Sequence, residues 1–373
     1  MFILEICPLY KHGNCCTAMK VLTLYQGNAY FNFIESLHSE STKRNYAYGL
    51  KHFLTHHQLK DPEEILSIPL DSLEEMIKKY VVFLTTVHKS SGMARVNLAT
   101  LRHFCKMNKI KLDWDLITAF KGKGRIKGKD KAYDHEDIHK LLSVCSIRLK
   151  VIVLIYASTG IRSAALPPLK LKHITKIDNI YKFNIYDDDN EAYYSLCTPE
   201  CANAIDKYLE YRQRYGEKLT PESPLIREDF STAGNIRQKP RHITSSTITT
   251  ILIDKLNKIG IREVDHVKGC RSRKSVKIIH GFRKFFETQL LQSDVNYVVT
   301  KMLMDHDLKL EENYFRPTQE YIIKEYSKAT DFLTIDPSQR LKRQLVHEKE
   351  KNTETSKILA RLTKLEADIG IKI

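Results

Sequence analysis

The sequence has no apolar run long enough to cross a membrane. A transmembrane helix needs roughly 18 or more apolar residues in succession, and no stretch of the 373 residues meets that need. The apolar start of the chain contains Glu5 and has no basic segment before it, so it does not resemble a signal peptide. These absences predict a cytoplasmic protein without a membrane partner.

Cysteine pairs of the kind that hold a disulfide framework or a metal are also missing. The eight cysteines are scattered along the chain, which in a reducing compartment predicts free thiols. Cys197 and Cys201 have no second Cys or His pair at ligand spacing, whereas a closed zinc site needs four ligands. Between them, Thr198 and Pro199 are typical of the N-cap and first residue of a helix. We therefore expect no metal and no other cofactor.

Negative charge is scarce relative to positive charge. Sixty Lys and Arg residues against 45 Asp and Glu residues give a formal net charge of +15 and a pI near 9.2. The segments 121–131 and 268–277 each carry a net charge of +5. Such an excess usually serves a polyanion. Neither an RNP-like aromatic stretch nor a GXXG loop occurs, which disfavours an RNA-binding module.

The first half of the chain is helical in pattern. From 24 to 120 apolar residues recur at helical spacing, as at Leu73, Ile77 and Leu84, and predict a small all-α domain after an N-terminal extension, 1–23. Ser72 and Glu75 have capping-box spacing, so we expect a helix to begin there. Glycines alternate with basic residues after 120 and predict a flexible linker over 121–133. A linker that only solubilises the protein is the alternative.

A second domain is predicted over 134–335. Asp134 is a candidate N-cap, and Gly160 ends an apolar helix. Alternating residues at 181–185 and 194–196 predict a β-hairpin around a polar loop, and helices follow. The tail, 336–373, has the composition of a solvated helix. The expected class is mainly α with a small β-hairpin or sheet, that is, α+β.

Three segments of the second domain carry residues suited to phosphate chemistry. Arg162 follows the helix stop in TGIR, where its planar fork can meet a phosphate. His280 and Arg283 are three residues apart on one helix, so a proton-transfer group lies beside a permanent cation. His306 and, eight residues later, Tyr314 complete the set.

The order of these motifs resembles the tyrosine recombinase, or phage integrase, family. The archaeal and archaeal-virus branch of this family is similar in sequence over three segments: TGIR followed by LPPLKLKHI, YYSLCTPEC and ENYFRPT. The resemblance covers about 134–335, and it implies that 24–120 is a SAM-like core-binding domain that clamps DNA. It also implies a homo-tetramer on double-stranded attachment sites, a nucleoid-associated location and no cofactor; accessory proteins stay open.

The resemblance implies a role for each residue. Tyr314 would attack a DNA phosphodiester and form a 3′-phosphotyrosyl link, and Arg162 and Arg283 would stabilise the charge on phosphorus. His280 would transfer the tyrosine proton, and His306 would hydrogen-bond a phosphate oxygen. DNA contacts are expected from the two basic segments, at Lys121, Lys123, Arg125, Lys127, Lys129, Lys131, Lys268, Arg271, Arg273 and Lys274.

The sequence departs from the family pattern at two places. The hairpin lysine that serves as general acid is replaced by DDDN at 187–190, which leaves Lys182, or Lys176 before it, as candidates. Asp305 stands before His306 where the family usually has glycine, which puts the local turn in question. Tyr321 and Tyr326 also follow His306, and their apolar neighbours suggest core aromatics.

The predicted function is site-specific recombination that integrates or excises a viral or mobile element without a metal. One alternative is a DNA-binding protein that kept the recombinase scaffold but lost activity with the lysine. Another is a relaxing enzyme of the type IB topoisomerase kind, which shares the nucleophile but needs no partner site.

Overall fold

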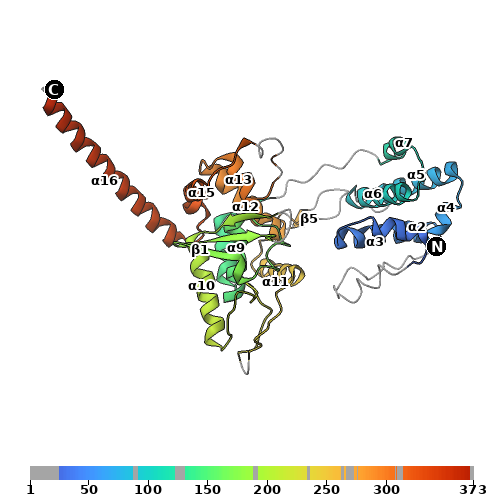
Figure 1. Cartoon of the computed structure of the whole chain (residues 1–373), viewed down its shortest axis with the longest axis horizontal. Coiled ribbons are helices and arrows are strands. Elements are labelled where there is room, and N and C mark those ends of the chain that lie inside the picture. Colours follow the sequence, from blue (N-terminus) through green and yellow to red (C-terminus); the bar gives the residue numbers. More distant parts are fainter. Residues whose placement is uncertain are drawn as a thin grey trace. The chain divides into compact units, whose positions relative to one another are not determined.

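The structure is a computed structural model that describes residues 25–86, 91–121, 131–187, 192–232, 236–261, 264–265, 273–274, 276–306, 308 and 314–369. In these ranges the chain is mostly helical with a three-stranded and a two-stranded antiparallel sheet, which confirms the predicted α+β class (Figure 1). The described residues up to 121 form one compact unit, and those from 131 onward form another. No helix in these ranges is long and apolar enough to cross a membrane.

The N-terminal unit is all-helical, as its apolar spacing predicts. Phe33, Phe53 and Tyr80 lie at the centre of its core. One helix begins earlier than expected: the N–H of Leu73 donates to the carbonyl of Pro69, so Ser72 lies inside the first turn and is not the N-cap. The helices are α2 (Asn28–Glu35), α3 (Glu40–His56), α4 (Glu63–Leu66), α5 (Leu70–Thr86), α6 (Ser91–Met107) and α7 (Trp114–Ala119).

The C-terminal unit places helices around a three-stranded antiparallel sheet. The predicted hairpin is present, and an additional strand pairs with its first strand to give the order β1-β2-β3. The strands are β1 (Ile174–Ile177), β2 (Ile180–Ile185) and β3 (Tyr193–Leu196), with a separate pair β4 (Val264–Asp265) and β5 (Arg273–Lys274). The helices are α8 (His135–Ser143), α9 (Ile147–Thr159), η1 (Leu171–His173), α10 (Pro199–Arg214), α11 (Ser245–Lys258), α12 (Ile278–Gln292), α13 (Tyr297–Leu303), α15 (Gln319–Leu333) and α16 (Pro337–Ile369).

Helix α9 forms the centre of this unit. It is apolar on all sides, and from Val151 to Thr159 every residue is buried. It packs against α10, α12 and β3, while α12 packs in turn against α15 (Figure 1). The core therefore holds the ends of α9 and α12 in fixed positions beside the sheet.

Local signals at the helix ends behave as predicted. Asp134 forms a capping box at α8, and the side chain of Thr198 caps α10.

The packed unit begins earlier than the predicted linker end at 133. Lys131 forms a β-bridge with Val276, and Tyr133, only 3% exposed, donates to the carbonyl of Ile278 at 3.0 Å. The burial of Tyr133 therefore places it in the packed unit, although it follows the basic segment.

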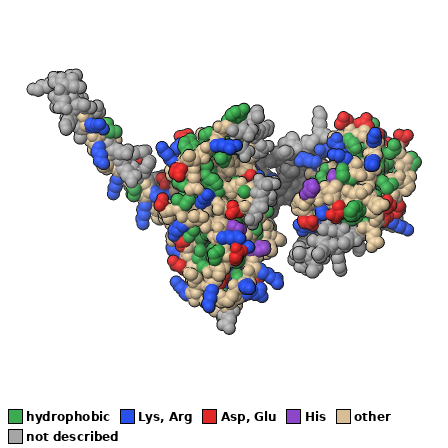
Figure 2. All heavy atoms as spheres, in the orientation of Figure 1, with side chains coloured by type: hydrophobic (Ala, Val, Ile, Leu, Met, Phe, Trp, Pro, Cys, Tyr) green, Lys and Arg blue, Asp and Glu red, His purple; other side chains and the backbone are tan. Residues whose placement is uncertain are grey.

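The tail forms the long helix α16, as its composition predicts. Leu341, Leu345 and Leu359 are each more than half exposed. Lys and Arg side chains line the described part of this helix (Figure 2). At these three apolar positions the helix is open to solvent.

Candidate active site

Arg162 stands just beyond the end of α9. The helix ends at Thr159 because Gly160 takes a left-handed backbone conformation with φ at 62°. A Cβ on Gly160 would collide with the ring of Phe286, so only glycine fits there. This turn brings Arg162 out of the buried helix, and its side chain is 44% exposed.

Arg283 connects the ends of two helices. It projects from α12, is 7% exposed, and donates to the carbonyl of Gly160 at 2.7 Å and to the carbonyl of Met304. Burial, and then the positive charge of Arg162, lower its pKa, although an arginine remains protonated in proteins. The structure thus brings the two predicted arginines together. Two of the five guanidinium N–H groups donate to the backbone, and the other three form no hydrogen bond with a described residue.

The turn before His306 has a backbone conformation that glycine usually adopts, although the residue at this position is Asp305. Helix α13 ends at Leu303, and Asp305 takes a left-handed conformation with φ at 50°. The N–H of Asp305 donates to the carbonyl of Met302 at 3.1 Å, and that of His306 to the carbonyl of Lys301 at 3.0 Å. This is the Schellman arrangement, in which aspartate is tolerated. The departure from glycine therefore leaves a tight helix-terminating turn in place.

His306 lies in a positively charged environment. Burial lowers its pKa below the ordinary value, and the charges of Arg283, Lys301 and, more weakly, Arg162 lower it further. Glu287 acts in the opposite direction and binds the amine of Lys301 at 2.5 Å. His306 is therefore uncharged at neutral pH and retains one ring N–H as a donor.

Asp305 adds a contact that the sequence did not predict. Its carboxylate accepts from Nη1 of Arg162, and its carbonyl accepts from Nη2 at 2.6 Å. The two residues are 143 positions apart. A carboxylate and a phosphate seek the same fork of N–H groups. In this protein the fork of Arg162 is already occupied by an internal anion.

The remaining predicted catalytic residues lie at the surface. His280 is exposed in the first turn of α12, one helical turn before Arg283. Tyr314 is 87% exposed and forms no hydrogen bond with the described residues. The structure does not bring Tyr314 to the arginines.

The two rival tyrosines differ from each other. Tyr326 is 1% exposed and donates to the carbonyl of Ser158 at 2.7 Å, as expected of a core aromatic. Burial raises its pKa far above the ordinary value. Tyr321 is 38% exposed and packs edge-on against Phe315, so it is not a core residue. It stands in the first turn of α15, which is an amphipathic helix with one open side.

The structure places Lys182 away from the arginines. Its amine donates to Gln319 at 2.8 Å and lies 4.7 Å from the centre of the Tyr194 ring. Lys182 alternates along β2 with Phe183, which is buried, so it projects from the opposite face of the sheet. Lys176 is bound to Asp206 at 2.7 Å. Neither amine reaches the Arg162 and Arg283 pair, and the general acid is not identified by these contacts.

Most of the predicted DNA-contacting residues lie outside the described residues, namely Lys123, Arg125, Lys127, Lys129, Lys268 and Arg271. Lys121 follows α7, and Lys131 is in the bridge to Val276. Arg273 and Lys274 form β5. Their role in binding DNA stays a prediction.

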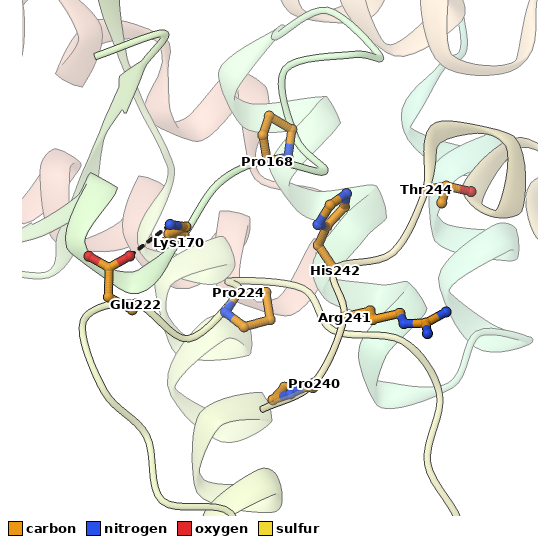
Figure 3. Close-up of a pocket in the computed structure, with 8 residues that line it drawn as sticks. All are labelled: Pro168, Lys170, Glu222, Pro224, Pro240, Arg241, His242 and Thr244. Atoms are coloured by element: carbon orange, nitrogen blue, oxygen red, sulfur yellow. Dashed lines mark hydrogen bonds and ion pairs between the residues drawn. The ribbon is translucent and has the colours of Figure 1, made fainter. Parts of the chain in front are cut away.

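A hollow of about 350 Å³ opens on another part of the C-terminal unit (Figure 3). Prolines and polar side chains line it, and the amine of Lys170 binds Glu222 at its edge at 2.7 Å. None of its lining residues is Arg162, Arg283 or His306. The candidate site is therefore separate from this hollow.

Two residues near the site, Glu287 and Tyr193, were not predicted from the sequence. Glu287 lies one turn after Arg283 on α12 and binds Lys301, and that helical spacing was visible in the sequence. Tyr193 lies close enough to both arginines for their charges to oppose the rise that burial causes in its pKa. Nothing local in the sequence indicates this, because strand pairing and packing bring Tyr193 there. Among the described residues, no group of three or more His, Cys, Asp or Glu side chains could hold a metal ion.

Known proteins resemble the chain in fold and not in sequence. No protein-family model matches it, and no curated protein is similar in sequence. The Tn1549 transposon integrase in complex with transposon right end DNA aligns with a TM-score of 0.53 at 12% identity, over 83% of this chain and 98% of that one. A lambda integrase tetramer bound to a Holliday junction aligns with a TM-score of 0.50 at 12% identity, over 78% of this chain and 76% of that one. The chain therefore has the fold of these integrases.

Proposed function

We propose that this protein is a site-specific DNA recombinase of the tyrosine recombinase kind. The observation that carries the proposal is the convergence of three side chains from separate segments: Arg162 after the end of α9, Arg283 within α12 and His306 after the end of α13. Two permanent cations beside a neutral imidazole suit a phosphodiester whose negative charge grows in the transition state. The likeness in fold to two integrases supports the same assignment.

The proposed reaction is a transesterification. The hydroxyl oxygen of Tyr314 attacks phosphorus, the bond from phosphorus to the 5′-oxygen breaks, and the DNA is left joined to the tyrosine through a 3′-phosphate. Arg162 and Arg283 stabilise the non-bridging oxygens, and His306 donates a hydrogen bond to one of them. His280 accepts the proton of Tyr314. The 5′-oxygen takes up a proton as it leaves, and rejoining reverses these steps.

The exposure of Tyr314 fits this role. A nucleophile that must reach a DNA strand cannot be buried, and Tyr314 is 87% exposed, whereas Tyr326 is enclosed in the core. Tyr314 is also within eight residues of His306 along the chain. DNA binding is therefore proposed to bring the tyrosine to the phosphate held by the arginines.

The finer parts of the proposal concern the biological setting. We propose that 24–120 is the core-binding domain and 134–335 the catalytic domain, and that a homo-tetramer acts on double-stranded attachment sites of an archaeal virus or mobile element. The basic segments 121–131 and 268–277 would bind the DNA backbone. Neutralising the linker should weaken binding and reduce its dependence on salt concentration.

A trapped covalent intermediate tests the proposed function. The protein is mixed in EDTA with a nicked duplex that carries its attachment sequence, and a denaturing gel detects the protein–DNA adduct. Wild type should form the adduct without a metal, Tyr314→Phe should form none, and Tyr321→Phe should behave as wild type. Tyr321 is a matched control because it is also exposed and lies only seven residues away. An adduct that persists in Tyr314→Phe would contradict the assignment.

A second candidate is a DNA-binding protein that has lost the chemistry. The contact of Lys182 with Gln319 and that of Asp305 with Arg162 favour it, because one amine and one guanidinium are already occupied. This protein would bind the duplex but form no adduct. Relaxation of plasmids that lack the attachment site would instead indicate a topoisomerase.

A further inference from the structure

Tyr193 has a buried hydroxyl group with no hydrogen-bond partner among the residues that the structure describes. A buried polar group without a partner costs free energy, so each one calls for an explanation. Its neighbour Tyr194, by contrast, packs against the amine of Lys182. The orphan hydroxyl belongs to β3, the strand that packs against both α9 and α13.

The pairing of the strands shows which way Tyr193 points. Tyr193 and Ser195 are two residues apart, so they project from the same face of β3. The hydroxyl of Ser195 donates to the carbonyl of Thr159 at 2.9 Å. Thr159 precedes Gly160, whose carbonyl accepts from Arg283. This face of β3 is therefore the face beside the turn that carries both arginines.

The charges around Tyr193 identify it as a donor. Burial raises its pKa to about 12, against the smaller opposing effects of Arg283 and Arg162. The group is therefore a protonated hydroxyl at neutral pH. The guanidinium groups beside it have N–H donors and no acceptor, so they cannot accept its proton. Among the described residues its O–H group has no acceptor, and an anion attracted by the arginines would supply one.

We propose that Tyr193 is a third hydrogen-bond donor to the DNA phosphate, acting on a non-bridging oxygen held between Arg162 and Arg283. This inference rests on the proposed function. The phosphate displaces the carboxylate of Asp305 from Arg162 as it enters, and the hydroxyl of Tyr193 then gains an acceptor, which the described residues do not provide. Tyr194 alternates with it on β3 and takes no part.

Tyr193→Phe tests the inference because it should lower the cleavage rate without lowering the stability. The variant loses a hydroxyl that has no partner, so its melting temperature should stay the same or rise. Cleavage of the nicked duplex should slow by about tenfold or more, which is typical for the loss of a hydrogen bond to a charged group. Tyr194→Phe is the matched control and should cleave at the wild-type rate.

A second measurement keeps this inference separate from the proposed function. Inorganic phosphate should raise the melting temperature of wild type and Tyr194→Phe more than that of Tyr193→Phe, whether or not the protein cleaves DNA. If wild type forms no adduct but this difference is present, the proposed function fails and the phosphate contact stands. If Tyr193→Phe cleaves as fast as wild type, the hydroxyl has no part in catalysis and the inference is wrong. If the variant melts at a lower temperature than wild type, the hydroxyl has a structural role and the inference is also wrong.

Discussion

The pairing of Asp305 with Arg162 leads to a quantitative prediction for Asp305→Asn. Under the proposed function, the scissile phosphate must displace the carboxylate of Asp305 before it can bind the fork of Arg162. Asparagine has nearly the same size, carries no charge and tolerates the left-handed backbone at this position. The change should therefore remove the charged contact to Nη1 of Arg162, while the backbone contact to Nη2 and the turn before His306 are preserved.

The exposure of the pair sets the size of the effect. The side chains of Arg162 and Asp305 are 44% and 28% exposed, so solvent screens their attraction. Exposed ion pairs contribute up to about 1 kcal/mol, and two contacts to one guanidinium place this pair at the upper end. Because about 1.4 kcal/mol corresponds to a tenfold change, about 1 kcal/mol corresponds to roughly fivefold. We expect Asp305→Asn to bind the duplex and to cleave it at limiting DNA up to about fivefold better.

The assay combines fluorescence anisotropy for DNA affinity with the rate of adduct formation at limiting and saturating DNA. Asp331→Asn is the control, because Asp331 is 31% exposed and also pairs with an arginine, Arg343 at 3.5 Å. It removes the same charge elsewhere in the unit and should show little gain. The advantage of Asp305→Asn should also shrink as salt is raised. If Asp305→Asn instead cleaves tenfold more slowly at saturating DNA, Asp305 orients Arg162 and does not compete with phosphate.

Two further predictions concern stability. Glu217 accepts from the buried Arg212 and Arg227 at 2.5 and 2.6 Å, so Glu217→Gln should leave buried positive charge uncompensated and destabilise the C-terminal unit by about 3–5 kcal/mol. Glu222→Gln, at an exposed ion pair with Lys170, should leave the melting temperature almost unchanged, and thermal unfolding followed by circular dichroism measures both variants. Burial, and then His56, lower the pKa of His57 from 6.5 to about 4, so the unfolded chain binds the extra proton and the N-terminal unit should lose stability as pH falls from 6.5 towards 4. Because His57 is only about half buried, the loss of unfolding free energy should be near 1 kcal/mol. Denaturant unfolding followed by the fluorescence of Trp114 measures the stability of this unit. If the unfolding free energy of His57→Gln depends on pH as steeply as that of wild type, the assignment to His57 is wrong.

Local patterns predicted the helices and their ends well. The caps at Asp134 and Thr198 and the stop at Gly160 each depend on residues within one helical turn, so their physics is present in a short stretch of sequence. The early start of α5 shows the limit of such patterns. Pro69 precedes the helix and its carbonyl accepts the first bond, which a capping-box pattern at Ser72 does not anticipate.

The third strand of the sheet was not predicted. Ile174–Ile177 carries only a weak alternation of apolar and polar residues, and it becomes a strand because β2 offers it backbone hydrogen bonds. Tyr321 was misassigned for a related reason. Its apolar neighbours face the core, but the side chain itself lies on the open side of α15.

By itself, the sequence determined the fold class, most helix termini and the chemical types present at the candidate site: two arginines, two histidines and a tyrosine in a fixed order. These depend on side-chain chemistry and on short-range periodicity. Only the tertiary structure decided which groups meet. Arg162 pairs with Asp305 across 143 residues, Arg283 connects the ends of α9 and α13, and the hydroxyl of Tyr193 lies beside them without a partner in the described part of the chain. The physical reason is that such contacts are set by the packing of α9, α12, α13 and β3 around one core, and no local pattern encodes that packing.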